Sequence, residues 1–137
     1  MYTTETTVRV NYSMTDKMGY VFFGNYPTFY DIGRTELLRE LGMSTARLEK
    51  MGIMLPVRKI ESDYLHPALY DELLTIRTTL KKISPLRLDF QFEIFNSEKI
   101  RLNLGHLQLI FVDSQTRSPR RSEDIVHQIK QQIHEHA

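Results

Sequence analysis

Apolar and polar residues alternate with a period of two in several stretches, the pattern of strands that bury one face. The clearest is the stretch 87–94, whose apolar positions are Leu88, Phe90, Phe92 and Ile94. Similar alternation occurs in the stretches 6–13, 53–65, 74–80 and 102–111. The phase is disturbed near Pro56 and at Gly105, which predicts a bulge or an edge position at the first and a bulge at the second.

One stretch instead has helical periodicity. Asn25 is a favourable N-cap residue, Pro27 suits a first helical turn, and Gly42 suits a helix end, so we expect a long helix from Asn25 to Leu41. Its apolar stripe consists of Tyr26, Phe29, Tyr30, Gly33, Leu37 and Leu41. This stripe is wide and aromatic, which predicts that the helix lies on a sheet. A shorter helical segment is expected at 43–51, and a short C-terminal helix after Ser122.

One long helix together with about five antiparallel strands predicts an α+β fold, in which the sheet wraps around the helix. The chain of 137 residues is expected to form a single domain, 1–137. Regular edge strands tend to pair with other chains, so we expect homo-oligomerisation.

The composition excludes several classes of function. The chain has no cysteine, so neither a thiolate nucleophile nor a disulfide is available. A net charge of +1 without a basic cluster argues against nucleic-acid binding. No apolar run is long enough to span a membrane, and the first residues do not resemble a signal peptide, so a cytoplasmic location is expected. His127 and His134 lie seven residues apart without a supporting carboxylate spacing, so no metal site is expected.

The loop before the long helix contains one acid, Asp16, in the sequence T-D-K-M-G. The N-terminus of a helix presents unpaired N–H groups, here expected at Phe23 and Gly24, and favours anions. An acid and two N–H donors that face one point are the minimum set for acyl transfer, because the acid activates a nucleophile and the donors stabilise an oxyanion. The simpler interpretation is that Asp16 is a turn or capping residue.

Tyr12-Ser13-Met14-Thr15-Asp16, with Gly19, Val21, Asn25-Tyr26 and Arg34-Thr35-Glu36, resembles the signature of hotdog-fold acyl-CoA thioesterases. The nearest groups are the hydroxybenzoyl-CoA thioesterase family and its Tol-Pal-associated acyl-CoA thioesterase relatives. The resemblance continues through L-P-V-R at 55–58, then Tyr64, Pro67 and Asp71, and finally Gly105 with F-V-D at 111–113.

The resemblance implies a hotdog fold and hydrolysis of an acyl-CoA thioester, with Asp16 as nucleophile or general base. It also implies a homodimer or homotetramer with active sites between subunits, and no cofactor other than the CoA of the substrate. The chain departs from the family pattern at two positions. Met14 replaces the first Asp of a D-T-D motif, and Phe23 stands where the Tol-Pal-associated group has a histidine and the hydroxybenzoyl-CoA branch an aromatic residue.

Substrate-contacting residues are expected next to Asp16: Gly19, Tyr20, Val21, Phe22, Asn25 and Tyr26. Most of these could equally belong to the core. Arginine and lysine suit the phosphates of CoA, and the candidates are Arg58, Lys59, Arg117, Arg120 and Arg121, although each also suits a solvated face. A non-catalytic hotdog module that binds acyl or CoA groups, or a thioesterase acting on acyl carrier protein, remains an alternative.

Overall fold

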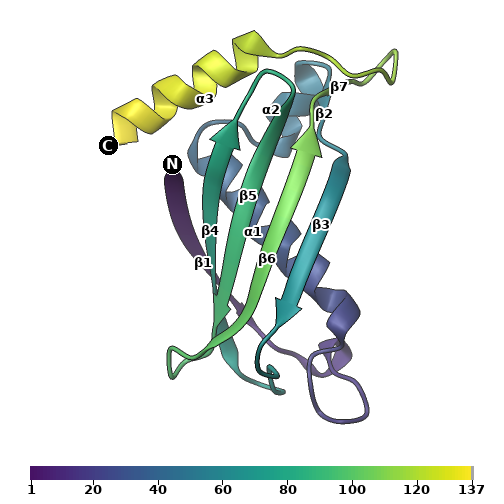
Figure 1. The fold of residues 1–137 in the computed structure, drawn as a ribbon, viewed down its shortest axis with the longest axis vertical. Helices are drawn as coiled ribbons and strands as arrows, with labels where there is room; N and C mark the ends of the chain where they lie inside the picture. Colours follow the sequence, from purple (N-terminus) through teal and green to yellow (C-terminus); the bar gives the residue numbers. More distant parts are fainter. Residues whose placement is uncertain (137) are drawn as a thin grey trace.

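The computed structural model describes residues 1–136, and its main element is a five-stranded antiparallel sheet with the order β1-β4-β5-β6-β3 (Figure 1). The strands are β1 (Tyr2–Arg9), β3 (Val57–Tyr64), β4 (Leu73–Ile83), β5 (Arg87–Phe95) and β6 (Arg101–Ile110). Two short strands pair separately at one end of the molecule, β2 (Ile53–Met54) with β7 (Val112–Asp113). Strands β1 and β3 are therefore the two edges of the main sheet.

The helices differ in how they meet this sheet. Helix α1 (Tyr26–Glu40) lies across one face and contacts β1, β4 and β5, and α2 (Thr45–Lys50) and α3 (Glu123–His136) lie near one end (Figure 1). Two 3-10 turns, η1 (Tyr12–Met14) and η2 (Phe23–Asn25), precede α1. The α+β hotdog architecture expected from the sequence is thus confirmed. Within residues 1–136, none of the helices combines the length and the apolar character that crossing a bilayer requires.

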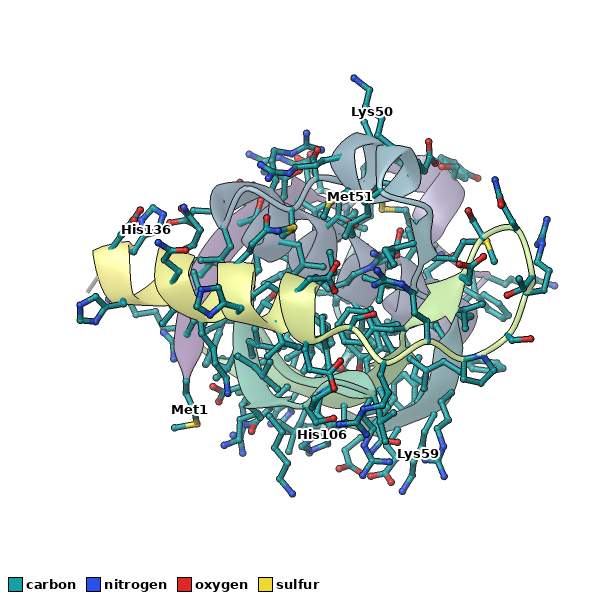
Figure 2. All side chains as sticks on the ribbon, turned by 90° about the horizontal axis from the view of Figure 1, so that it is seen from above. Met1, Lys50, Met51, Lys59, His106 and His136 are labelled. Atoms are coloured by element: carbon teal, nitrogen blue, oxygen red, sulfur yellow. The ribbon has the colours of Figure 1, made fainter. Side chains whose placement is uncertain are left out.

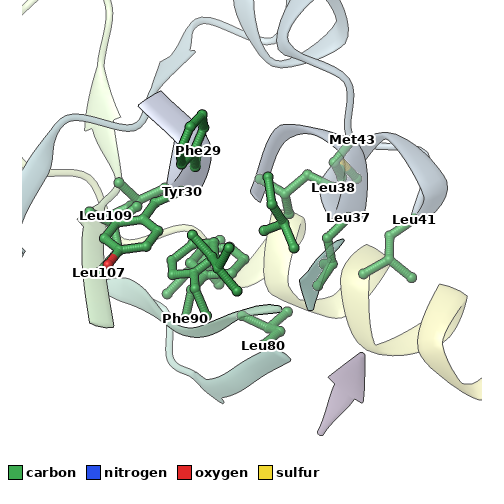
Figure 3. Packing of buried hydrophobic residues seen from close by; sticks show 14 of the residues in the cluster. Phe29, Tyr30, Leu37, Leu38, Leu41, Met43, Leu80, Phe90, Leu107 and Leu109 are labelled. Carbon is green, nitrogen blue, oxygen red and sulfur yellow. The ribbon is translucent and has the colours of Figure 1, made fainter. Parts of the chain in front are cut away.

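The core lies between α1 and the inner face of the sheet (Figure 3). The alternation in β4 and β5 correctly predicted which side chains are buried, and the helical stripe did so for α1 except that it missed Leu38, which is also buried. The ring of Tyr30 stacks on that of Phe92, with 4.7 Å between the ring centres. The outer face is polar, and Figure 2 shows Lys59 and His106 on it, directed away from the helices.

The bulge predicted at Gly105 is wrong. Gly105 pairs in register with Phe92. The register of the β5–β6 pair shifts elsewhere, between Ile94 and Phe95 of β5. A glycine is required at 105 for another reason, because a Cβ there would collide with the ring of Tyr30. The Tyr30 hydroxyl bonds with Asn103 Oδ1 and Ser62 Oγ, so this tyrosine occupies the space above β6.

Three boundaries also differ from the expectations. The stretch 53–65 is two strands rather than one, and the register shift near Pro56 falls between Val57 and Lys59 of the edge strand β3. Strand β1 ends at Arg9, after which the chain turns at η1. The C-terminal helix α3 has 14 residues, nearly the length of the 15-residue α1.

Candidate active site

The loop that carries Asp16 is a small hairpin closed by backbone bonds. The Asp16 N–H donates to Tyr20 O at 2.8 Å, and the Gly19 N–H donates to Asp16 O at 3.0 Å. Gly19 has a φ of +82°, which glycine adopts without the steric cost borne by other residues. The glycine therefore shapes the turn that presents Asp16, and it does not line the cavity described below.

The side chain of Asp16 is half-buried, and its two oxygens are in different situations. Oδ1 accepts the Met18 N–H at 2.9 Å, so the turn interpretation from the sequence is correct for this oxygen. Within residues 1–136, Oδ2 accepts no hydrogen bond. One oxygen thus fixes the carboxylate, while the other is available to a ligand or a water molecule.

The start of helix α1 supplies unpaired donors. Between the loop and the helix, η2 spans Phe23 to Asn25, and its first N–H groups are those of Phe23 and Gly24. Neither N–H donates to another group of residues 1–136. Unpaired N–H groups at such a position attract anions, because the aligned peptide dipoles add to the hydrogen bonds they can form.

A cavity of about 310 Å³ lies between this loop and the end of β3. Of the residues predicted from the sequence, five line it: Asp16, Tyr20, Val21, Phe23 and Tyr26. The other residues of its lining are Met18, Tyr64, Leu65, His66 and Pro67. The walls are therefore mainly apolar and aromatic, with one carboxylate among them.

Two tyrosines of the cavity lining contact each other edge to face. The rings of Tyr26 and Tyr64 lie 5.1 Å apart, with an interplanar angle of 87°. Tyr26 is almost fully buried, and burial raises the pKa of its hydroxyl, so it stays neutral. Tyr64 is half-exposed, and its hydroxyl donates to Phe23 O at 3.1 Å. The edge strand is thereby bonded to the turn that begins α1.

Two residues expected near the substrate have other contacts. Asn25 does not cap α1 with its side chain; its Nδ2–H donates instead to Met14 O at 2.8 Å. The Phe22 ring lies against that of Phe23 and across the position that a Cβ at Gly24 would occupy. Phe22, Gly24 and Asn25 do not line the cavity.

Met14 replaces an acid of the family pattern, and the loop uses this position through its backbone. The Met14 carbonyl accepts the Phe22 N–H at 2.9 Å as well as the amide of Asn25. The Met14 side chain packs against the core. These two bonds require no carboxylate at position 14, so the loop keeps its shape despite the departure.

None of the basic residues considered for the CoA phosphates lines the cavity that contains Asp16. Arg120 bonds with Asp124 at 3.1 Å and with Ser122 Oγ, and its guanidinium lowers the pKa of the Asp124 carboxyl. Arg121 pairs with Glu123. Arg58 donates to Gln108 Oε1 at 2.7 Å, and Lys59 pairs with Glu61 at 2.7 Å. Arg117 lies in an exposed turn with a φ of +62°.

Apart from Met18 of the Asp16 loop, the lining residues that sequence reasoning did not assign to the site are Tyr64 to Pro67, at the end of β3 and in the turn that follows it. Backbone contacts hold this turn to the Asp16 loop, since Tyr20 pairs with Leu69 and the Val21 N–H donates to Ala68 O at 2.8 Å. These contacts join positions more than forty residues apart, so no local pattern indicated them. Within the described chain, no three His, Asp or Glu side chains gather as metal ligands would.

This chain is similar to known proteins in both sequence and overall structure. The Escherichia coli O6:H1 protein named Acyl-CoA thioester hydrolase YbgC is 34% identical over 125 residues, which cover 90% of this chain and 93% of that relative. The structure of DHNA-CoA thioesterase from Staphylococcus aureus superposes with a TM-score of 0.90 at 30% identity. The superposed region covers 98% of this chain and 93% of that one. A hypothetical protein from Thermus thermophilus gives 0.85 at 27% identity, with coverages of 92% and 96%.

The family assignment rests on nearly the whole chain rather than on one motif. Residues 10–132 match the Thioesterase-like superfamily, a range that contains the Asp16 loop, α1 and all of the sheet except β1. This protein therefore belongs to the Thioesterase-like superfamily, whose members include hotdog-fold acyl-CoA thioesterases.

Proposed function

We propose that this protein hydrolyses an acyl-CoA thioester, with Asp16 as the carboxylate that forms or activates the attacking nucleophile. The observation that carries the proposal is that Asp16, whose Oδ2 accepts no bond within residues 1–136, lines the same cavity as Phe23, while the N–H groups of Phe23 and Gly24 are unpaired within those residues. The names of the relatives from Escherichia coli and Staphylococcus aureus support the choice of an acyl-CoA as substrate.

The proposed reaction needs few groups. Either Asp16 takes a proton from a water molecule that attacks the thioester carbonyl, or Asp16 itself attacks it and water then hydrolyses the resulting anhydride. In both cases the oxygen that becomes negative accepts hydrogen bonds from the Phe23 and Gly24 N–H groups. The C–S bond then breaks and CoA leaves as a thiolate, whose pKa is near the value of about 8.5 for a free cysteine thiol. A strong general acid is therefore unnecessary, and Phe23 in place of a histidine is compatible with turnover. No metal or redox cofactor takes part.

We further propose that the active form is a homo-oligomer that pairs through β3. This strand is an edge of the sheet, and its residues Val57, Ile60 and Tyr64 have 58%, 41% and 52% of their surface exposed to solvent. Apolar side chains on an open edge favour pairing with another chain. If two copies of β3 pair antiparallel, the start of the partner's strand lies beside the end of this one, which borders the cavity that contains Asp16.

The test of the proposed reaction is thiol release from a panel of aliphatic and aromatic acyl-CoAs, with wild type beside Asp16→Asn. Removing a positioned acid or base lowers the rate by about 10²–10⁴-fold, so we expect kcat to fall at least about a hundredfold. Glu98→Gln is the control, since Glu98 is an exposed carboxylate of the β5–β6 hairpin outside the cavity lining. Equal activity of Asp16→Asn and wild type, with both folded, would reject the role of Asp16.

The same panel separates an enzyme from a binding module. A protein that binds acyl-CoA without releasing thiol from any member would favour the non-catalytic alternative. Single turnover in H₂¹⁸O distinguishes the two roles of Asp16, because only a nucleophilic carboxylate forms an anhydride that can incorporate the solvent label into Asp16. Mass spectrometry of the peptide that contains residue 16 would detect the label.

A further inference from the structure

Tyr64 is bonded to the peptide group that carries one of the two proposed oxyanion donors. Its hydroxyl donates to Phe23 O at 3.1 Å, and this carbonyl belongs to the same peptide group as the Gly24 N–H. The Tyr26 N–H also donates to Phe23 O, as the 3-10 turn requires. Two donors therefore hold one side of a peptide whose other side, the Gly24 N–H, is unpaired within residues 1–136.

We infer that Tyr64 is a positioning residue that orients and polarises the Phe23–Gly24 peptide so that the Gly24 N–H can stabilise the oxyanion. The inference rests on the proposed thioesterase function and adds to it a residue that touches neither the carboxylate nor the thioester carbonyl. It also connects the edge strand β3 to the reacting atoms, although Phe23 and Tyr64 lie 41 residues apart in the chain.

Orientation matters here because of the glycine. A peptide plane that precedes glycine can rotate at low steric cost, since glycine tolerates both signs of φ. Rotation of the Phe23–Gly24 plane would turn the N–H away from its present direction and break both bonds to Phe23 O. The hydrogen bond from the Tyr64 hydroxyl opposes this rotation. Without it, only the hydrogen bond from the Tyr26 N–H would do so.

Polarisation acts in the same direction. Hydrogen bonds that share a peptide group strengthen one another, and a carbonyl that accepts a bond makes the N–H of the same group a better donor. The T-shaped contact with the buried ring of Tyr26 holds the ring of Tyr64, so the hydroxyl reaches Phe23 O from a supported position. The effect is largest when charge develops on the oxyanion. The Tyr64 hydroxyl therefore stabilises the transition state more than it stabilises the bound substrate.

The test is Tyr64→Phe, which removes only the hydroxyl and keeps the ring contact with Tyr26. We expect kcat to fall about tenfold with an unchanged KM, less than the 10²–10³-fold that loss of an oxyanion donor itself costs. Tyr70→Phe is the control, because Tyr70 is 59% exposed and lies outside the cavity lining. The Kd of a non-hydrolysable thioether analogue should be the same in all three proteins.

A spectroscopic measurement separates positioning from a general loss of structure. In the Asp16→Asn background, which should not turn over, the infrared band of a bound ¹³C=O-labelled acyl-CoA reports the donors on the carbonyl oxygen. We expect this band at a lower frequency than in solution, and Tyr64→Phe should move it back toward the solution value while Tyr70→Phe leaves it in place.

The outcomes distinguish this inference from the function on which it rests. If the wild type turns over and Asp16→Asn does not, but Tyr64→Phe keeps the wild-type kcat and band position, the role of Tyr64 is rejected and the proposed function stands. A change in KM alone would equally reject it, because the contact would then serve substrate binding. If the wild type hydrolyses none of the thioesters, the proposed function fails and the inference falls with it.

Discussion

Replacement of Gly33 by alanine tests the close approach of α1 to the sheet. A Cβ built at this position would lie 3.0 Å from Ile76 Cγ2, 3.2 Å from Phe92 Cε1 and closer still to Thr78 Oγ1. All three side chains are fully buried. Strands β4 and β5 are each hydrogen-bonded on both sides, so they have little freedom to move away.

Two effects of known size oppose each other in Gly33→Ala. Alanine is more favourable than glycine within a helix by about 1 kcal/mol. Overpacking a filled core costs about 1–3 kcal/mol, and contact with three side chains on two central strands favours the upper end of this range. We therefore expect the free energy of unfolding to fall by about 2 kcal/mol, a decrease in Tm of roughly 6–10 °C for a domain of this size.

Thr78→Ala provides the compensating change. Thr78 Oγ1 is buried without a hydrogen-bond partner in the described part of the chain, so its removal relieves a desolvation cost of about 1–3 kcal/mol. This gain offsets the loss of a buried methyl group, worth about 1 kcal/mol. In Gly33→Ala/Thr78→Ala the added methyl group takes the vacated space, so we expect a coupling energy of about 1–2 kcal/mol in favour of the double variant.

Chemical denaturation of the four proteins, followed by circular dichroism, measures this cycle. The slope of the transition should be the same in all four, so that differences in midpoint report stability alone. A Gly33→Ala variant that is more stable than wild type would show that a methyl group fits between helix and sheet. Additive effects in the double variant would show that Thr78 is not the obstruction.

Two predictions concern other parts of the molecule. Burial raises the pKa of Tyr30 to about 12 from the value of 10.0 for an unperturbed group, so the neutral hydroxyl stabilises the fold below pH 10, and this contribution is lost as pH rises toward 12. Tyr30→Phe should have a free energy of unfolding about 1–3 kcal/mol lower than that of wild type at pH 7, because Asn103 loses a donor. Between pH 10 and 12 the variant should lose less stability than wild type does. Equal pH profiles of the two proteins would contradict this. Light scattering should give a dimeric or tetrameric mass for wild type, and Ile60→Lys on the edge of β3 should lower this mass while Thr7→Lys on β1 should not. A monomeric wild type would reject pairing through β3.

The periodic parts of the sequence predicted the fold well, because each records which side of an element faces the core. The alternation of Leu88, Phe90, Phe92 and Ile94 specified the buried face of β5. The stripe on α1 likewise specified the surface that lies on the sheet. Gly105 was misread because a glycine within a strand indicates either a bulge or a close neighbour. Only the tertiary position of Tyr30 distinguishes these two causes.

For the site, the sequence located the local half. Asp16, Tyr20, Phe23 and Tyr26 are close in the chain, the loop and helix signals grouped them into one candidate site, and all four line one cavity. Asn25 shows the limit of such signals. Its residue type favours capping, but its amide bonds with Met14 O, because the preceding turn places this carbonyl within reach.

The sequence by itself determined the elements, their buried faces, the family and the single acid of the loop, since these depend on periodicity and on the order of neighbouring residues. The tertiary structure decided which residues complete the cavity and what each glycine accommodates. It alone placed Tyr64 against Phe23 O and Gly33 against Thr78. The physical reason is that these contacts join distant segments through the pairing of strands and the docking of α1, and such contacts leave no periodic trace in the sequence.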